Sequence, residues 1–248
     1  MWLLILSIAI QALLVVHCIK TGRNQIWIWV LVLLPYAGVL AYVAVELLPE
    51  LLNSRTTRRT MRDVKKALNP EAELRQLARR AELGGGVDAR ARHAEELMRL
   101  DRHAEAVEEY RRTLQGLYQH DPNLMLGLAR AQFGARQAAE ARATLDALIQ
   151  HNPDFRSADG HLLYARALET EGQPGRALQE YKVLAGYYPG AEATVRYARL
   201  LRQQGQAAPA AEALRGLLAQ AAVAPAHYRR TQDEWLTEAQ RELAALKT

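Results

Sequence analysis

A short pattern of residues recurs four times in the second half of this chain, and it constrains the fold more than any other feature. In each copy an alanine is followed four positions later by a large side chain, and a second alanine lies twelve positions before the first. The spacings between successive copies are 35, 36 and 33 residues. A single helix pair cannot bury its apolar face, so a pattern of this period predicts a stack of helix pairs. The residues are Ala106, Ala141, Ala177 and Ala210, the preceding Ala94, Ala129, Ala165 and Ala198, and the large Tyr110, Leu145, Tyr181 and Leu214.

With a period near 34 and a proline after the second and third copies, Pro153 and Pro189, the pattern resembles the tetratricopeptide repeat (TPR). The tryptophan that opens the family consensus is missing from all four copies. The resemblance implies an all-α fold, a TPR-like α-solenoid of about four helix pairs plus capping helices, with the first helix of each pair on the concave wall. It also implies a function in binding a protein or peptide in that concave groove.

Two long apolar stretches occupy the N-terminus. Residues 1–19 and 26–45 carry no charged side chain, and about twenty helical residues rise the 30 Å of a bilayer core. Six residues separate them, which is short enough to force an antiparallel arrangement. We therefore expect a two-helix transmembrane hairpin over residues 1–48. A cleaved signal peptide is the alternative for the first stretch, but that stretch lacks a basic start and an A-x-A cleavage site.

The second stretch has membrane-typical features of its own. Trp27 and Trp29 stand at one end, where indole rings favour the headgroup boundary, and Pro35 is expected to kink the helix near its middle. With Trp29, Pro35, Gly38 and Tyr42, the segment resembles the N-terminal membrane segment of cardiolipin synthases and other phospholipase D relatives. This resemblance implies an anchor, because the catalytic H-x-K signature of those enzymes does not occur in the chain. The whole chain resembles bacterial membrane proteins that join such a segment to divergent TPR repeats.

The net charge of +5 is concentrated in one segment. Residues 1–54 and 67–248 each sum to zero, whereas six basic residues between them face Asp63 alone: Arg55, Arg58, Arg59, Arg62, Lys65 and Lys66. Basic residues beside a membrane span are retained on the cytoplasmic side. We therefore expect a two-pass protein of the inner (plasma) membrane with both termini cytoplasmic and a basic juxtamembrane arm over residues 49–69.

The arm could also bind the anionic membrane surface, since each basic residue there contributes about 1 kcal/mol. The alternative is that these charges only determine topology. No aromatic residue interleaves them, as single-stranded nucleic acid binding requires, so no nucleic-acid partner is expected.

The remaining chain divides by helix signals. Asn69, Pro70 and Glu71 form a helix start, which predicts a capping helix or half repeat over residues 70–86. The repeats cover residues 87–224, and an amphipathic capping helix is expected over residues 225–248. Its apolar face comprises Tyr228, Trp235, Ala239, Leu243 and Leu246, and its polar face Arg229, Arg230, Glu234, Glu238, Arg241 and Glu242.

The residue after each alanine of the first helices should point into the concave groove. Three of the four are arginines, Arg130, Arg166 and Arg199, and a planar guanidinium suits the carboxylates of an acidic or extended peptide. The alternative is that these arginines only solvate a helical surface. The predicted peptide-binding groove comprises Asn123, Leu126, Arg130, Phe133, Leu162, Arg166, Arg199 and Arg202.

Motifs for catalysis or metal binding are missing from the sequence. It contains no G-x-S-x-G, no glycine-rich phosphate loop with a lysine, and no pair of histidines four residues apart beside an acid. The single cysteine argues against a disulfide or a thiolate metal site. No catalytic residue, cofactor or metal is therefore expected. We expect a membrane-anchored TPR scaffold or adaptor at the cytoplasmic face; the alternative is a lipid-associated or membrane-protein regulator in which the hairpin contacts the partner.

Overall fold

The computed structural model describes residues 12–16, 19–20, 26–42, 45 and 70–246. The chain divides into two compact units, residues 1–73 and residues 74–248. Every regular element within the described ranges is helical. This confirms the predicted all-α fold class for the part of the chain that the structure describes.

In the N-terminal unit, two helices of eight residues each, α2 (Ile26–Leu33) and α3 (Pro35–Tyr42), are separated by a bend at Leu34. Proline lacks an N–H and disfavours helical geometry in the residue before it, which accounts for the break. The rings of Trp27 and Tyr42 lie 5.4 Å apart, edge to face. In one continuous helix, fifteen residues would separate them by about 22 Å. The two helices therefore fold back on each other, and the expected single kinked helix is wrong within residues 26–42.

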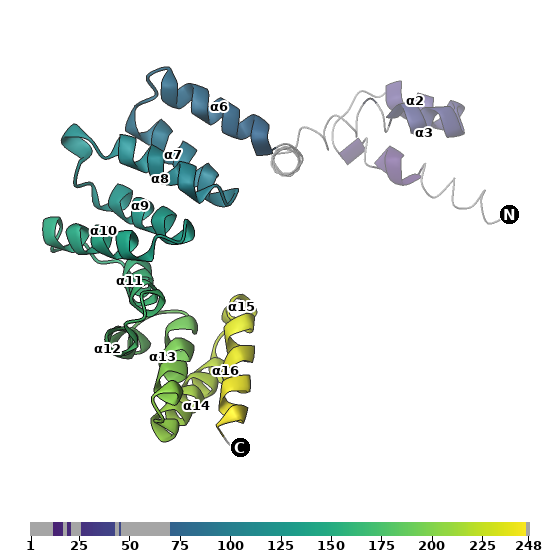
Figure 1. Cartoon of the computed structure of the whole chain (residues 1–248). Coiled ribbons are helices and arrows are strands. Elements are labelled where there is room, and N and C mark those ends of the chain that lie inside the picture. Colours follow the sequence, from purple (N-terminus) through teal and green to yellow (C-terminus); the bar gives the residue numbers. More distant parts are fainter. Residues whose placement is uncertain (1–11, 17–18, 21–25, 43–44, 46–69, 247–248) are drawn as a thin grey trace. The chain divides into compact units, whose positions relative to one another are not determined.

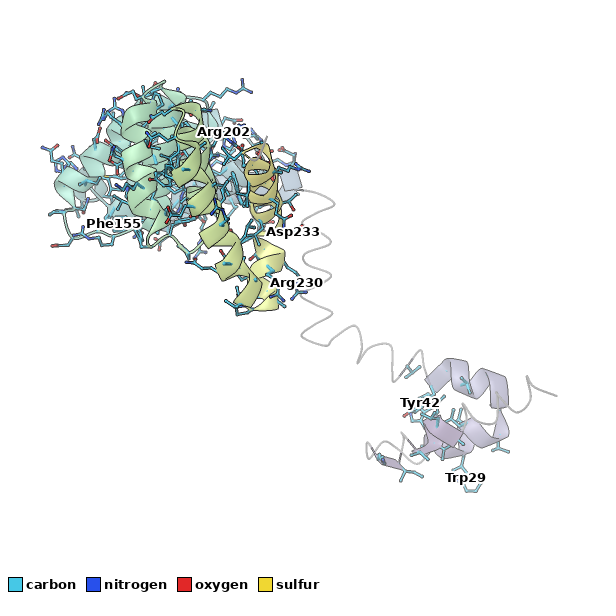
Figure 2. The ribbon with its side chains drawn as sticks, turned by 90° about the horizontal axis from the view of Figure 1, so that it is seen from below. Trp29, Tyr42, Phe155, Arg202, Arg230 and Asp233 are labelled. Atoms are coloured by element: carbon cyan, nitrogen blue, oxygen red, sulfur yellow. The ribbon has the colours of Figure 1, made fainter. Side chains whose placement is uncertain are left out.

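The N-terminal unit includes the residues of the predicted transmembrane hairpin, 1–48. In the part of the chain that the structure describes, no helix combines the length and apolarity needed to cross a membrane. Trp27 packs on Tyr42, while Trp29 is 68 % exposed; both Trp29 and Tyr42 are labelled in Figure 2. Most of the predicted first span, residues 1–19, lies outside the described residues. So do all six basic residues of the arm, Arg55, Arg58, Arg59, Arg62, Lys65 and Lys66.

The second unit is a succession of antiparallel helix pairs (Figure 1). The helix α6 (Pro70–Glu82) begins in the first unit and continues into the second, and a short 3-10 turn, η2 (Gly116–Tyr118), lies between the first and second pairs. The four pairs are α7 (Gly86–Arg99) with α8 (His103–Thr113), α9 (Pro122–Gly134) with α10 (Ala138–His151), α11 (Ala158–Thr170) with α12 (Pro174–Ala185), and α13 (Glu192–Gln203) with α14 (Ala207–Val223). The chain then forms α15 (Ala226–Thr231) and α16 (Asp233–Ala245).

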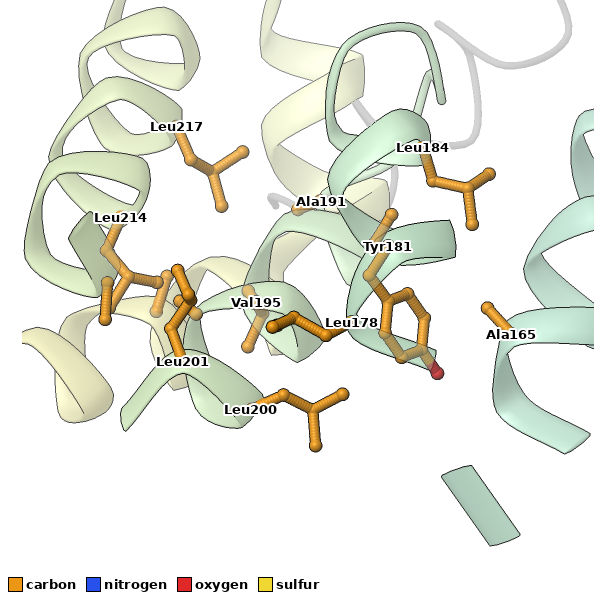
Figure 3. Close-up of a cluster of buried hydrophobic side chains, with 14 of the residues drawn as sticks. Ala165, Leu178, Tyr181, Leu184, Ala191, Val195, Leu200, Leu201, Leu214 and Leu217 are labelled. Atoms are coloured by element: carbon orange, nitrogen blue, oxygen red, sulfur yellow. The ribbon is translucent and has the colours of Figure 1, made fainter. Parts of the chain in front are cut away.

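The repeated alanines are the tight contacts of this stack. All eight are at most 1 % exposed, and the large residues that follow four positions later are at most 5 % exposed. Figure 3 shows one such contact, in which Tyr181 of α12 lies beside Ala165 of α11. A larger side chain at these alanines would separate the helices, and for this reason the sequence repeats a small residue there.

Each pair is joined by the same turn. The residues in left-handed conformation are Asp101, Arg136, Gly172 and Gly205, with φ of 56°, 63°, 73° and 76°. In every case the next residue donates its backbone N–H to the carbonyl five positions back, at 2.9 Å. This is the hydrogen bond of a Schellman C-cap, which closes the first helix and reverses the chain. The turn recurs at the same spacing as the alanines.

The C-terminal cap differs from the expected single helix. The chain breaks at Gln232, whose side-chain amide oxygen accepts a hydrogen bond from the backbone N–H of Ala191 at 2.9 Å. Trp235, Ala239 and Leu243 pack against the last repeat as predicted. Glu242, which the amphipathic pattern assigns to the polar face, is instead 8 % exposed and packed against α13. Glu242 therefore belongs to the packed side of the cap, whereas Glu234 and Arg241 of the same polar face stay exposed.

Candidate functional site

A groove of about 490 Å³ runs along the first helices of the repeats. Its helical lining comes from α7, α9, α11 and α13, which are all first helices. We call it the first-helix groove; it is lined by Met98, Arg130, Phe133, Gly134, Asp159, Leu162, Leu163, Arg166, Tyr188 and Glu192. The structure thus brings together four of the eight residues that the sequence predicted: Arg130, Phe133, Leu162 and Arg166.

Aromatic and aliphatic side chains form the floor of the groove, and two arginines stand above it. Leu162 is 5 % exposed, and the guanidinium of Arg166 lies 4.9 Å from the centroid of the Phe133 ring. Such stacking fixes the plane of the guanidinium and keeps its charge near an apolar surface. The groove therefore combines apolar contact area with oriented cations.

Both arginines have only loose acidic partners. Arg130 lies 3.5 Å from Asp159, and Arg166 Nε lies 3.6 Å from Glu192. Arg166 Nε is buried and has no hydrogen-bond partner among the described residues. Since an unmade hydrogen bond at a buried donor costs free energy, a ligand carboxylate that reoriented this side chain would recover it. These two arginines can accept a further anion without losing a short ion pair.

Arg199 and Arg202 are placed differently. Arg199 donates to Glu238 at 2.6 Å and to Glu242 at 3.0 Å, and Arg202 Nε lies 3.1 Å from Glu242. All of these acids belong to α16. The capping helix therefore neutralises the C-terminal half of the predicted arginine row, and the structure does not place Arg199 or Arg202 in the first-helix groove.

The same kind of arginine–carboxylate pair recurs along the stack. Arg130 of α9 reaches an acid of α11, Arg166 of α11 reaches an acid of α13, and Arg199 of α13 reaches acids of α16. Arg130 and Arg166 thus link the first helix of one repeat to that of the next, and Arg199 links the last first helix to the capping helix. Neither of the two alternatives raised by the sequence, a ligand-binding row or a solvating surface, included these inter-repeat contacts, which are loose for Arg130 and Arg166 and short for Arg199.

The other two predicted residues lie away from the groove. Asn123 is exposed at the start of α9, where its backbone N–H donates to the capping side chain of Asp121 at 3.0 Å. Leu126 is 7 % exposed and lines a separate hollow. Both lie on the same face of α9 as Arg130 and Phe133 but nearer the start of the helix, beyond the lining of the groove.

That hollow, which the sequence did not indicate, has a volume of about 470 Å³. It lies among α10, α11 and α12, and we call it the α10–α12 hollow. Sequence patterns miss it because its lining comes from several separate segments, with no common period. Its principal lining residues are Leu126, Leu145, Leu148, Ile149, Phe155, His161, Tyr164, Glu180 and Tyr187; Phe155 is labelled in Figure 2.

The polar end of the hollow centres on His161. Its Nε2 lies 2.7 Å from Glu180 Oε2, and its Nδ1 lies 2.6 Å from the Tyr187 hydroxyl. Burial, with a smaller contribution from the Glu180 charge, raises the pKa of Tyr187. Both ring nitrogens of His161 are therefore engaged, and the imidazole orients the side chains of Glu180 and Tyr187 on either side of it.

A half-buried set of polar contacts links the groove to the capping helix. Tyr181 donates to Glu169 at 2.7 Å, Arg196 donates to Glu169 at 3.1 Å and to Glu192 at 2.7 Å, and the Arg196 guanidinium lies 5.3 Å from the Trp235 ring. Burial raises the pKa of Tyr181. Glu192 of the groove is therefore fixed by Arg196 and is not free to move with Arg166.

Stacked helix pairs with a groove along their first helices define a helical-repeat protein. Residues 97–167 match the family model described as tetratricopeptide repeat. Residues 97–167 are therefore similar to tetratricopeptide repeats, and the helix pairs around them form a TPR-like solenoid. The match begins at residue 97, so the cardiolipin synthase-type N-terminus stays a prediction.

Solved structures share this fold. The TPR-like repeats of a putative kinesin light chain from Podosopora anserina are 18 % identical, with a TM-score of 0.51, over 64 % of this chain and 84 % of that one. A MamA protein gives 16 % identity and a TM-score of 0.52 over 62 % and 85 %. A thermophilic TPR protein of Thermus thermophilus gives 17 % and 0.51 over 75 % and 96 %. A comparison with curated protein sequences found no match.

Proposed function

We propose that this protein is a scaffold or adaptor that binds a partner protein or peptide in the first-helix groove. The observation that carries the proposal is the convergence of Arg130 and Arg166, both loosely paired, above the apolar floor of Phe133 and Leu162. An extended segment with acidic side chains fits this lining, because its carboxylates can meet guanidinium groups while its apolar residues cover the floor.

The test compares partners captured by the purified full-length protein and by two variants. In the first, Arg130 and Arg166 are both changed to glutamate, which reverses the charge of the groove. In the second, Arg215→Glu makes the same kind of change at an exposed position of α14 outside the groove. A groove partner should be lost by the first variant and retained by the second. Capture of the same proteins by all three forms would exclude the groove.

We further propose that the scaffold is anchored in the bacterial inner membrane through residues 1–48, with the repeats and both termini in the cytoplasm. Support comes from the two uncharged stretches and from the six basic residues that follow them. A reporter fused after Thr248 tests this placement. A reporter active only in the cytoplasm should work there, and activity of a periplasm-only reporter would overturn the topology.

The second candidate is a lipid-associated or membrane-protein regulator in which the hairpin contacts the partner. The basic arm favours it, because six cations beside a span attract anionic lipid. Changing Arg55, Arg58, Arg59 and Arg62 to glutamine separates the two candidates. Partner capture should survive these changes if the groove is the binding site, and it should fail if the membrane-proximal segment is.

A further inference from the structure

The α10–α12 hollow has the features of a second binding site. Its volume of about 470 Å³ is within the range of sites that hold a ligand group, and its walls are leucine, phenylalanine and tyrosine side chains. Two large apolar side chains at its rim are exposed to solvent, Ile149 at 57 % and Tyr187 at 51 %. An apolar hollow that opens between such residues suits a side chain presented by another protein, rather than an enclosed small molecule.

The charge of the hollow decides what kind of segment it accepts. Among the described lining residues, Glu180 is the single carboxylate, and its side chain is 35 % exposed. Most acids of the neighbouring helices hold an arginine: Glu171 pairs with Arg142, Glu169 with Arg196, and Asp159 with Arg130. Glu180 contacts His161 instead, and no arginine or lysine reaches it within the part of the chain that the structure describes.

Arg156, which also lines the hollow, does not pair with Glu180. Its guanidinium donates to the backbone carbonyl of Pro153, within its own loop. The carboxylate end of the hollow is therefore complementary to a cation brought by a partner, and the tyrosine rings beside it can also contact that cation.

We propose that the α10–α12 hollow binds a peptide segment in which a bulky aliphatic residue stands one helical turn from an arginine. The aliphatic side chain fills the space between Leu145, Leu148 and Phe155, and the guanidinium reaches Glu180. This recognition is opposite in charge to that of the first-helix groove and uses the other side of α11. The protein would then hold two segments of different chemistry at once.

The test is a binding titration of the full-length protein with three short alanine-based peptides, acetylated and amidated. One carries leucine and arginine one helical turn apart, the second has glutamate in place of the arginine, and the third has serine in place of the leucine. The first peptide should bind at least about tenfold more tightly than either of the others, because each replacement removes one of the two contacts.

Variants locate the binding on the molecule. Glu180→Gln should weaken binding of the first peptide about tenfold, whereas Glu212→Gln, which removes the same charge at an exposed position of α14, should leave it unchanged. Ile149→Ser tests the apolar half, with Val223→Ser, at an 88 % exposed residue, as its control. These residues are exposed or half-buried, so the variants are expected to fold, and circular dichroism checks this.

The experiment also distinguishes binding in the α10–α12 hollow from binding in the first-helix groove. Changing Arg130 and Arg166 to glutamate should not affect the arginine peptide if it occupies the hollow. The proposal is overturned if the first peptide fails to bind, if the arginine and glutamate peptides bind equally, or if Glu180→Gln has no effect.

Discussion

Gly127 of α9 lies directly against the ring of Tyr110 of α8. A β-carbon at Gly127 would stand 2.6 Å from two carbons of that ring, which is itself 5 % exposed. The first and second repeats therefore meet where Gly127 has no side chain and the ring of Tyr110 fills the space. This contact joins the first two repeats of the stack through the middle of the groove-bearing helix α9.

The prediction is that Gly127→Ala lowers the free energy of unfolding by about 1 to 3 kcal/mol, because the buried ring has little room to move. Gly216→Ala is the matched control. Gly216 is also within a helix, but nothing lies within 4 Å of a β-carbon there. It should raise stability by about 0.5 to 1 kcal/mol, since alanine favours a helix. Denaturant unfolding of the wild-type protein and the two variants measures both changes. If Gly127→Ala and Gly216→Ala changed the free energy of unfolding equally, the close packing of Tyr110 on Gly127 would be contradicted.

A second prediction concerns the shared turn. Arg136 and Asp101 adopt the left-handed conformation in which the equivalent positions carry glycine, at Gly172 and Gly205. A residue with a β-carbon is strained there by about 1 kcal/mol. Arg136→Gly should therefore raise the midpoint of thermal unfolding, and Gly172→Ala should lower it. An Arg136→Gly protein that unfolds at a lower temperature would show that the arginine side chain contributes more than the turn.

The repeat itself was predictable from sequence because its signals are local. The alanines and the large residues four positions on recur within each pair, and the turn glycines Gly172 and Gly205 mark two of the four turns. The position of Arg130 and Arg166 in the groove follows from the same register. Four of the eight predicted groove residues were found in this way.

Features that depend on distant partners were not predictable. Glu242 belongs to the polar face of its helix by pattern, yet it is buried because Arg199, 43 residues earlier, meets it in the stack. Pro35 indicated a bend, but a uniformly apolar sequence does not specify that Trp27 will contact Tyr42. The α10–α12 hollow likewise exists only once three helices are packed together.

The third prediction tests the closure of the stack by α16. Glu242 is 8 % exposed and contacts both Arg199 and Arg202. Glu242→Ala removes the contacts of a buried carboxylate with two charged groups, but Arg199 keeps Glu238 and Arg202 is 42 % exposed, so the protein should be destabilised by about 1 to 2 kcal/mol. Glu234→Ala, at an exposed position of the same helix, should change stability by less than about 0.5 kcal/mol. Similar losses in both variants would mean that helix propensity, and not the ion pair, sets the effect.

The last prediction is a loss of stability at alkaline pH that depends on Tyr110. Burial raises the pKa of Tyr110 to about 12, from an ordinary value of 10.0. The folded protein therefore keeps the phenol proton between these two values while the unfolded chain releases it. The resulting contribution, about 3 kcal/mol, is fully present below pH 10 and is lost as the pH rises toward 12.

Tyr110→Phe keeps the ring against Gly127 and removes the ionisable group. Its stability should fall less steeply than that of the wild-type protein between pH 10 and 12, as measured by denaturant unfolding at each pH. Some decline will remain, because burial also raises the pKa of Tyr181. Tyr118→Phe, at a residue that is 45 % exposed, is the control and should follow the wild-type curve. If the Tyr110→Phe curve also follows that of the wild-type protein, ionisation of Tyr110 is not coupled to unfolding, and the contact with Gly127 is open enough for water to reach the hydroxyl.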